Sequence, residues 1–206
     1  MPVIQSVKGR NEEYAVLGVD LHYGCVHGCL DCPVPERMKW KPVRFFGAAR
    51  MRPGVLGGLK REIYNLRQLD GPILLCPNTD PYQRESASNW VVRTAIEILN
   101  RRGLGAVIRT KAGKPAEKDL DLLKGHPDNL LVVPLPPDET IRQEREPKAA
   151  PVQERLSLIQ LAKFLGVKTV IEKDSGALPL KPQQGVLPLV TPQSSPPTAG
   201  MIDLFS

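Results

Sequence analysis

Residues 22–32 read HYGCVHGCLDC, a stretch that places three of the chain's four cysteines within eight residues. Cys25, Cys29 and Cys32 are too close together to close the long loops that a disulfide framework stabilises. Three cysteines in one short loop are typical of a metal or cluster site in a reducing compartment. We therefore expect a cytoplasmic protein whose chemistry centres on this loop.

The spacing of the three cysteines leaves the identity of the bound group open. Three thiolates can hold three irons of a four-iron cluster and leave the fourth iron without a protein ligand. They can also bind zinc, with His22 or His27 as a fourth ligand, or they can lie together by chance. An open position on a metal would let the site bind and activate a small molecule.

Short apolar runs alternate with amphipathic stretches along most of the chain. This alternation predicts right-handed crossovers and a parallel sheet, so the fold class is α/β. We expect a partial (β/α) barrel, similar to a TIM barrel, of about five to six parallel strands. The expected strands are 15–21, 73–76, 106–110, 129–135 and 167–171, and the expected helices lie near 56–66, 91–99, 116–123 and 152–165, the last with Leu156, Ile159 and Phe164 facing the core.

The chain divides near residue 173. Residues 1–173 carry the strand and helix pattern, whereas residues 174–206 are rich in proline and serine and predict a loosely attached tail, with a possible short strand over 186–190. No apolar stretch approaches the roughly 18 residues of a membrane span. The N-terminus has no apolar segment of signal-peptide length, so we expect no membrane partner.

Polar side chains follow three of the expected strands. The cysteines follow the first strand, Asn78, Thr79 and Asp80 follow the second, and Lys111 follows the third. The carboxyl ends of parallel strands lie on one rim of a barrel. We therefore expect these groups to meet at a single site.

The basic charge of the chain is concentrated just after the cysteine loop. The whole chain has a net charge of +6, and residues 36–67 alone carry +7. Arg37, Lys39, Lys41 and Arg44 surround Trp40, and flat rings among cations suit a polyanion whose bases can stack. These residues predict a nucleic-acid-binding surface, with an ordinary solvated basic face as the alternative.

The stretch HYGCVHGCLDC resembles the CxxxCxxC loop of the radical S-adenosylmethionine (SAM) enzymes, and particularly the branch of spore photoproduct lyase and related DNA repair photolyases. The sequence TDPYQ at 79–83, Thr110 with Lys111, and the stretch 118–123 are similar to further segments of that branch. Glu146-Pro147 followed by Arg155-Leu156 resembles another. The similarity covers about residues 14–170, in the same order.

The resemblance implies a radical SAM enzyme, lyase-like, that cleaves SAM to a deoxyadenosyl radical for repair or modification of nucleic acid. By resemblance, Cys25, Cys29 and Cys32 bind a 4Fe-4S cluster that an electron donor protein reduces. Thr79 and Asp80 then face the amino end of SAM, Lys111 pairs with its carboxylate, and Cys76 is a candidate hydrogen-atom donor. The alternative is a non-catalytic module that binds nucleic acid and holds a cluster or zinc.

The apolar segment Met201–Phe205 ends the tail. Exposed apolar side chains at a chain end need a reason, because they expose surface that burial would stabilise. One expectation is that this segment folds back onto the open side of the barrel. The other is a partner, because the segment is similar to the short peptides that bind the bacterial sliding clamp.

Overall fold

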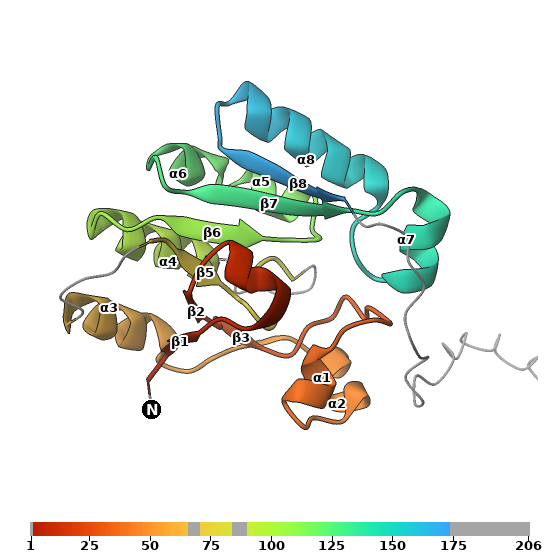
Figure 1. The fold of residues 1–206 in the computed structure, drawn as a ribbon, viewed down its shortest axis with the longest axis horizontal. Coiled ribbons are helices and arrows are strands. Elements are labelled where there is room, and N and C mark those ends of the chain that lie inside the picture. Colours follow the sequence, from red (N-terminus) through yellow and green to blue (C-terminus); the bar gives the residue numbers. More distant parts are fainter. Residues whose placement is uncertain (1, 66–70, 84–89, 174–206) are drawn as a thin grey trace, which may run out of the picture.

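The computed structural model describes residues 2–65, 71–83 and 90–173, which form an α/β fold around one mostly parallel sheet (Figure 1). The strand order is β1-β2-β5-β6-β7-β8, with β1 antiparallel to β2 and the other four pairings parallel. The strands are β1 (Ile4–Ser6), β2 (Leu17–Val19), β5 (Ile73–Leu75), β6 (Ala106–Arg109), β7 (Leu130–Leu135) and β8 (Thr169–Lys173). The predicted fold class and all five predicted strands are confirmed. β1 and β8 are the outer strands, so the sheet is open.

Helices pack against one face of this sheet (Figure 1). They are α3 (Val55–Asn65), α4 (Trp90–Arg101), α5 (Lys114–Glu117), α6 (Leu120–Lys124) and α8 (Val152–Phe164). The strands turn alternate side chains toward them, for example Ile73 and Leu75 of β5, and Ala106 and Ile108 of β6. This main core of aliphatic side chains accounts for most of the buried apolar surface, the dominant stabilising contribution.

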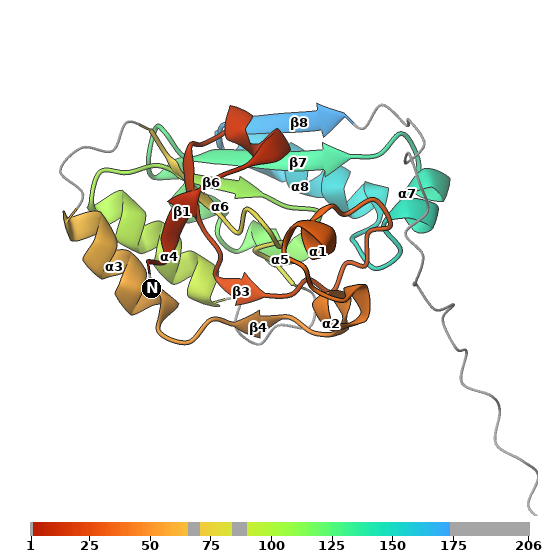
Figure 2. The same cartoon turned by 60° about the horizontal axis from the view of Figure 1, so that its bottom comes forward.

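The opposite face of the sheet is covered by the N-terminal segment, which includes the 3-10 helix η1 (Gly9–Glu13) (Figure 2). Leu74, Val107 and Val132 point to this side and pack with Val7 and Ala15. Because the central strands are buried on both faces, they read in the sequence as continuous apolar runs. The N-terminal cover also brings polar side chains near the carboxyl ends of the strands.

Two expectations about the helices are wrong. The stretch 116–123 is not one helix, because α5 and α6 are separate and Asp119 lies between them. In α8, Phe164 is 86% exposed, whereas Arg155 is fully buried beside Leu158 and Ile159. Of the three side chains expected to face the core, Ile159 is buried and Leu156 is half-buried, so the expectation is wrong for Phe164, which lies on the solvent side of α8.

The region after β2 leaves the main sheet. A small ribbon of β3 (His22–Tyr23) and β4 (Arg50–Met51) lies near α1 (Val34–Arg37) and α2 (Pro42–Gly47) (Figure 2). The remaining helix, α7 (Glu139–Arg145), follows β7. None of the helices in the described ranges is long and apolar enough to cross a membrane. The predicted tail 174–206, with its expected strand at 186–190 and its terminal motif Met201–Phe205, lies outside the described residues.

Candidate functional site

The cysteine loop follows β3 and is held by contacts with α2 and with the segment after α2. Gly24 has a φ of +76°, and a Cβ at this position would lie 2.2 Å from the carbonyl oxygen of Ala48. Only glycine fits such a turn, because any larger residue would meet backbone. One residue later, the Cys25 amide donates a hydrogen bond to the carbonyl of Phe45 (2.9 Å). The start of the loop is therefore defined by backbone contacts outside it.

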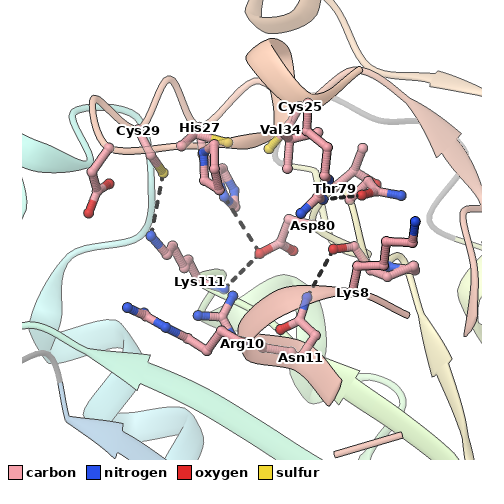
Figure 3. Close-up of a pocket in the computed structure, with 17 residues that line it drawn as sticks. Lys8, Arg10, Asn11, Cys25, His27, Cys29, Val34, Thr79, Asp80 and Lys111 are labelled. Atoms are coloured by element: carbon pink, nitrogen blue, oxygen red, sulfur yellow. Dashed lines mark hydrogen bonds and ion pairs between the residues drawn. The ribbon is translucent and has the colours of Figure 1, made fainter. Parts of the chain in front are cut away.

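A cavity of about 400 Å³ lies beside this loop, at the carboxyl ends of the central strands (Figure 3). It brings together the side chains that the sequence placed after three different strands. Its lining includes Cys25, Cys29, Cys32, Asn78, Thr79, Asp80 and Lys111. The expected convergence of these groups on one rim is confirmed.

The three thiols of the loop lie in a poorly solvated environment. Burial raises the pKa of Cys25 to about 11 and that of Cys29 to about 12, and it also raises the pKa of Cys32. A coordinated metal displaces the thiol proton outright, so these shifts describe the metal-free thiols. Because a metal must displace these protons, only a group that binds thiolates strongly would occupy the site.

Asp80 holds the turn after β5 to the end of β6. Its Oδ1 accepts hydrogen bonds from the Tyr82 amide (2.8 Å) and the Thr110 hydroxyl (2.7 Å). Its Oδ2 accepts one from the Lys111 amide (2.7 Å) and lies 3.5 Å from Nδ1 of His27. A carboxylate has about four acceptor positions. Asp80 therefore has little capacity left for a direct bond to a ligand.

Lys111 connects the cysteine loop to a buried ion network. Its Nζ lies 3.5 Å from Sγ of Cys29 and forms an ion pair with Glu146, which also pairs with the fully buried Arg155. Burial alone would lower the pKa of Lys111, but Cys29 and Glu146 outweigh burial and raise this pKa. Burial alone would likewise raise the pKa of Glu146, whereas Lys111 and Arg155 together lower it. Lys111 is thus a charged ammonium held at the edge of the cysteine site.

The two histidines proposed as zinc ligands lie in different places. His27 lines the cavity near Asp80, whereas His22 is buried on the far side of Asn78 and Thr79, in a second cavity. Burial lowers the pKa of both rings, so both are neutral near pH 7. Within residues 2–65, 71–83 and 90–173, no group of three or more His, Cys, Asp or Glu side chains converges on a point where one metal ion would bind.

Cys76 follows β5 and has an unusual backbone conformation. Its φ is +62°, a value that non-glycine residues rarely adopt. The side chain is 3% exposed, its Sγ lies 3.8 Å from Nδ1 of His22, and burial raises the pKa of its thiol. Neither of the two cavities described for this structure has Cys76 in its lining. Strained backbone is often retained where function needs it.

The predicted nucleic-acid-binding residues lie on and around α1 and α2. Arg37 lines the large cavity and donates a hydrogen bond to the side chain of Asn78. Lys39, Lys41 and Arg44 are exposed, and the Arg44 guanidinium lies 5.2 Å from the centre of the Trp40 ring. The basic surface therefore continues from the cavity mouth onto these two short helices.

Sequence reasoning missed the contribution of the N-terminal segment. Lys8, Arg10 and Asn11 line the large cavity (Figure 3). Arg109 of β6 also lines it. Arg10 and Arg109 both pair with Glu172 (3.3 and 2.7 Å). Lys8 and Arg10 lie five or more residues before the first expected strand, and no spacing pattern distinguishes them from surface charges.

No protein-family model matches the sequence, and no curated protein matches it. Solved structures do match over 81% of the chain, at a TM-score of 0.62 and 14% sequence identity for one single-residue variant of spore photoproduct lyase. The described fold is similar to that of part of spore photoproduct lyase. Other matches include that lyase with bound AdoMet and dinucleoside spore photoproduct, and its complex with the dinucleoside alone, each at a TM-score of 0.61 and 14% identity. The present chain spans 47% of the length of these spore photoproduct lyase chains.

Proposed function

We propose that this chain is a radical SAM protein that holds a 4Fe-4S cluster and acts on nucleic acid, with a lyase-type repair or modification reaction. One observation carries the proposal. The three cysteines of a CxxxCxxC loop line the same cavity as Thr79, Asp80 and Lys111, on the fold of a repair lyase. A cluster that needs reduced thiolates also favours the cytoplasm.

The residues fit a cluster better than a single ion. Bridging sulfides separate the irons of a cluster, so its protein ligands need not converge on one point. This agrees with three cysteines that share a cavity without forming a single-ion site among the described residues. Cys25, Cys29 and Cys32 would hold three irons, and the cavity offers room beside them. A bound cluster would supply the electron that cleaves SAM to a deoxyadenosyl radical.

The polar residues of the cavity fit the charges of SAM. Lys111 is a buried ammonium beside Cys29, well placed to attract a carboxylate. Thr79 lines the cavity, and its buried hydroxyl has no hydrogen-bond partner of ordinary geometry among the described residues, so we assign it to the amine of the ligand. The Asp80 carboxylate already accepts hydrogen bonds from the protein, so it would attract the amino group of SAM through its negative charge. It also fixes the backbone of Lys111 by accepting a hydrogen bond from the Lys111 amide.

The role of Cys76 as a hydrogen-atom donor remains part of the proposal. The thiol follows β5 four residues before Asp80, and His22 contacts it. Because the Cys76 side chain lines neither cavity, hydrogen transfer would need Thr79 or His22 to move aside. The buried, neutral thiol keeps the S–H bond that such a transfer requires.

Nucleic acid as the substrate rests on charge and on the bound molecules of similar structures. Three of the matching spore photoproduct lyase structures contain dinucleoside spore photoproduct. Here, Arg37 at the cavity mouth and Lys39, Lys41 and Arg44 beside it offer cations for phosphates. An electron donor protein and a sliding clamp contact through Met201–Phe205 complete the proposed set of partners.

The test is anaerobic reconstitution with iron and sulfide, followed by a SAM-cleavage assay. The wild type should bind about four irons per chain and release deoxyadenosine from SAM. Cys29→Ala should lose the cluster, while Cys76→Ala, a matched loss of a buried thiol outside the loop, should load normally. A colourless protein with one zinc would favour the non-catalytic module instead, and full loading of Cys29→Ala would refute the ligand assignment.

A further inference from the structure

The second half of the cysteine loop is bonded to a segment much later in the chain. The Leu30 amide donates a hydrogen bond to the carbonyl of Arg145, the last residue of α7 (2.9 Å). The Lys148 amide donates one to the carbonyl of His27 (3.2 Å). His27 and Leu30 lie on either side of Cys29, a proposed cluster ligand. The backbone around Cys29 is therefore held from outside the loop.

The segment that provides the second of these bonds, residues 146–150, also reaches the other part of the proposed cofactor site. We call this segment the strap. The Ala150 amide donates a hydrogen bond to the carbonyl of Lys111 (3.1 Å), and the Glu146 carboxylate pairs with the Lys111 ammonium. One short segment thus contacts both the cysteine loop and the residue that follows the end of β6.

Arg142 of α7 fixes the shape of the strap. Its Nη1 donates hydrogen bonds to the carbonyls of Glu146 and Pro147 (both 3.1 Å) and a longer one to the carbonyl of Ala149 (3.5 Å). The strap lies between α7 and α8 and has no helix or strand of its own. Its carbonyls can converge on one nitrogen only if the chain curls around the guanidinium. Arg142 therefore contributes the contacts that a regular element would otherwise supply.

Arg142 is itself oriented by a carboxylate. Its Nε and Nη2 donate to Oε1 of Glu139 (2.9 and 2.6 Å), and the residue is 7% exposed. Oε2 of Glu139 accepts a hydrogen bond from the Val152 amide at the start of α8 (2.9 Å). Stability alone gives little reason for a buried ion pair, because apolar residues of similar volume commonly stabilise a fold as well. The pair at this position therefore needs another reason.

We infer that Arg142 is a positioning residue, which acts through the strap to hold the cysteine loop in place for its cluster. The inference rests on the proposed function and adds a residue that the site depends on without contact. Arg142 lines neither cavity, so its influence passes through the strap. A loop that is already ordered loses less conformational entropy when its side chains bind a ligand.

The first experiment measures amide hydrogen exchange in the metal-free full chain. The Leu30 and Lys148 amides should exchange about tenfold faster in Arg142→Met than in the wild type, because the strap opens locally without its cation. The Leu131 amide, which bonds the Lys168 carbonyl (2.9 Å), reports on opening of the sheet. Its exchange should change much less than that of the two loop contacts.

Asn129→Ala is the matched control. Asn129 is 1% exposed, and its side chain bonds the backbone of Ala106 (2.7 Å) and of Leu122 (3.0 Å), so this variant also removes buried hydrogen bonds. Asn129 directly precedes β7, whereas the loop lies at the carboxyl ends of the strands. The control should leave the exchange of Leu30 relative to Leu131 as in the wild type.

The second experiment follows the loss of iron from the reconstituted protein to a chelator. Arg142→Met should lose iron about tenfold faster than the wild type, as is common when residues that orient metal ligands are replaced. Asn129→Ala should keep the wild-type rate. If Arg142→Met fails to fold, Glu139→Gln takes its place, since the Glu139 side chain is 42% exposed. This variant should change both measurements in the same direction by a smaller factor.

Unchanged exchange of Leu30 and Lys148 in Arg142→Met would overturn the inference, and so would iron loss at the wild-type rate. Equal effects of Arg142→Met and Asn129→Ala would also overturn it, because Arg142 would then act only through overall stability. Failure of the proposed function has a different signature. The wild type would then assemble no cluster, while exchange in the metal-free protein would still respond to Arg142→Met.

Discussion

Nζ of Lys111 lies 3.5 Å from Sγ of Cys29, although the two residues are 82 positions apart in the chain. The end of β6 thus places a cation against the cysteine loop. The same ammonium pairs with Glu146, and Glu146 pairs with Arg155. A single buried network therefore links the proposed cluster site to the helix side of the sheet.

Lys111→Met should weaken SAM binding without preventing cluster assembly. The variant removes the proposed partner of the SAM carboxylate, and Glu146 keeps Arg155 as its counter-ion. A hydrogen bond to a charged group contributes roughly 1.5–3 kcal/mol, so the Kd should rise about tenfold to a hundredfold. Equilibrium dialysis with labelled SAM on the reconstituted protein measures this, and an unchanged Kd would remove Lys111 from the SAM site.

Arg155→Met should destabilise the fold by about 3–5 kcal/mol, because it leaves the buried Glu146 carboxylate with one cation fewer. Arg155 is fully buried and also donates hydrogen bonds to the carbonyls of Ala150 (3.1 Å) and Pro134 (2.8 Å). Urea denaturation of the metal-free protein gives the free energy of unfolding. Arg101→Met, which removes a side chain that is 82% exposed, is the control and should cost less than about 0.5 kcal/mol. Similar losses in the two variants would contradict the account.

Asp119 and Asp121 lie on either side of Leu120, the first residue of α6. They should make the free energy of unfolding depend on pH in opposite directions. Burial raises the pKa of Asp119 above 3.8, so its contribution to stability falls as the pH rises from 3.8 through its folded-state pKa. The hydrogen bond from Arg93 lowers the pKa of Asp121, so its contribution is lost as the pH falls below 3.8. Asp119→Asn should remove the first dependence and Asp121→Asn the second.

Urea midpoints of the metal-free variants between about pH 3 and 6, which brackets the ordinary carboxyl range, measure these slopes. The slope from Asp121 should be the smaller, since that side chain is 60% exposed. If the two variants shift the profile in the same direction, the assignment of the shifts to burial and to Arg93 is wrong.

Neutralising Arg37, Lys39 and Lys41 together should weaken nucleic-acid binding and reduce its salt dependence. Each lost phosphate contact on a single strand lowers the slope of log K against log salt by about 0.7, so the triple variant should lose about two units. Fluorescence anisotropy at several salt concentrations measures the slope. Lys124, Lys163 and Lys168, exposed on or just after α6 and α8, form a control triple that should change the slope little. If the two triple variants lower the slope equally, then Arg37, Lys39 and Lys41 act through the overall positive charge of the chain and not through their own phosphate contacts.

The strands were predictable because the central ones are buried on both faces, so that runs such as Ile73–Leu75 are apolar throughout. The convergence of the cysteines, Asp80 and Lys111 followed from the topology of parallel strands. β1 was missed because its three residues are at most half-buried and carry no periodic pattern. The short helices α1 and α2 depend on packing of Val34 and Phe45 against the loop, which no local pattern reveals.

The partners inside the site were harder to foresee. The resemblance to the radical SAM enzymes implies that Asp80 faces the amino end of SAM, whereas in the structure its oxygens accept hydrogen bonds from Tyr82, Thr110 and Lys111. The sequence shows Glu146 only as part of a motif, because nothing at a separation of 35 residues indicates an ion pair with Lys111. Such pairings depend on tertiary packing and become visible only in three dimensions.

The central claim is that Cys25, Cys29 and Cys32 hold a four-iron cluster whose open iron binds SAM. Electron paramagnetic resonance of the reconstituted, reduced protein tests it most directly, with SAM and with adenosine, which lacks the amino and carboxylate groups. The account predicts a reduced-cluster signal whose g values change on addition of SAM and not of adenosine. A signal that SAM leaves unchanged, or a protein that assembles no cluster, would contradict it.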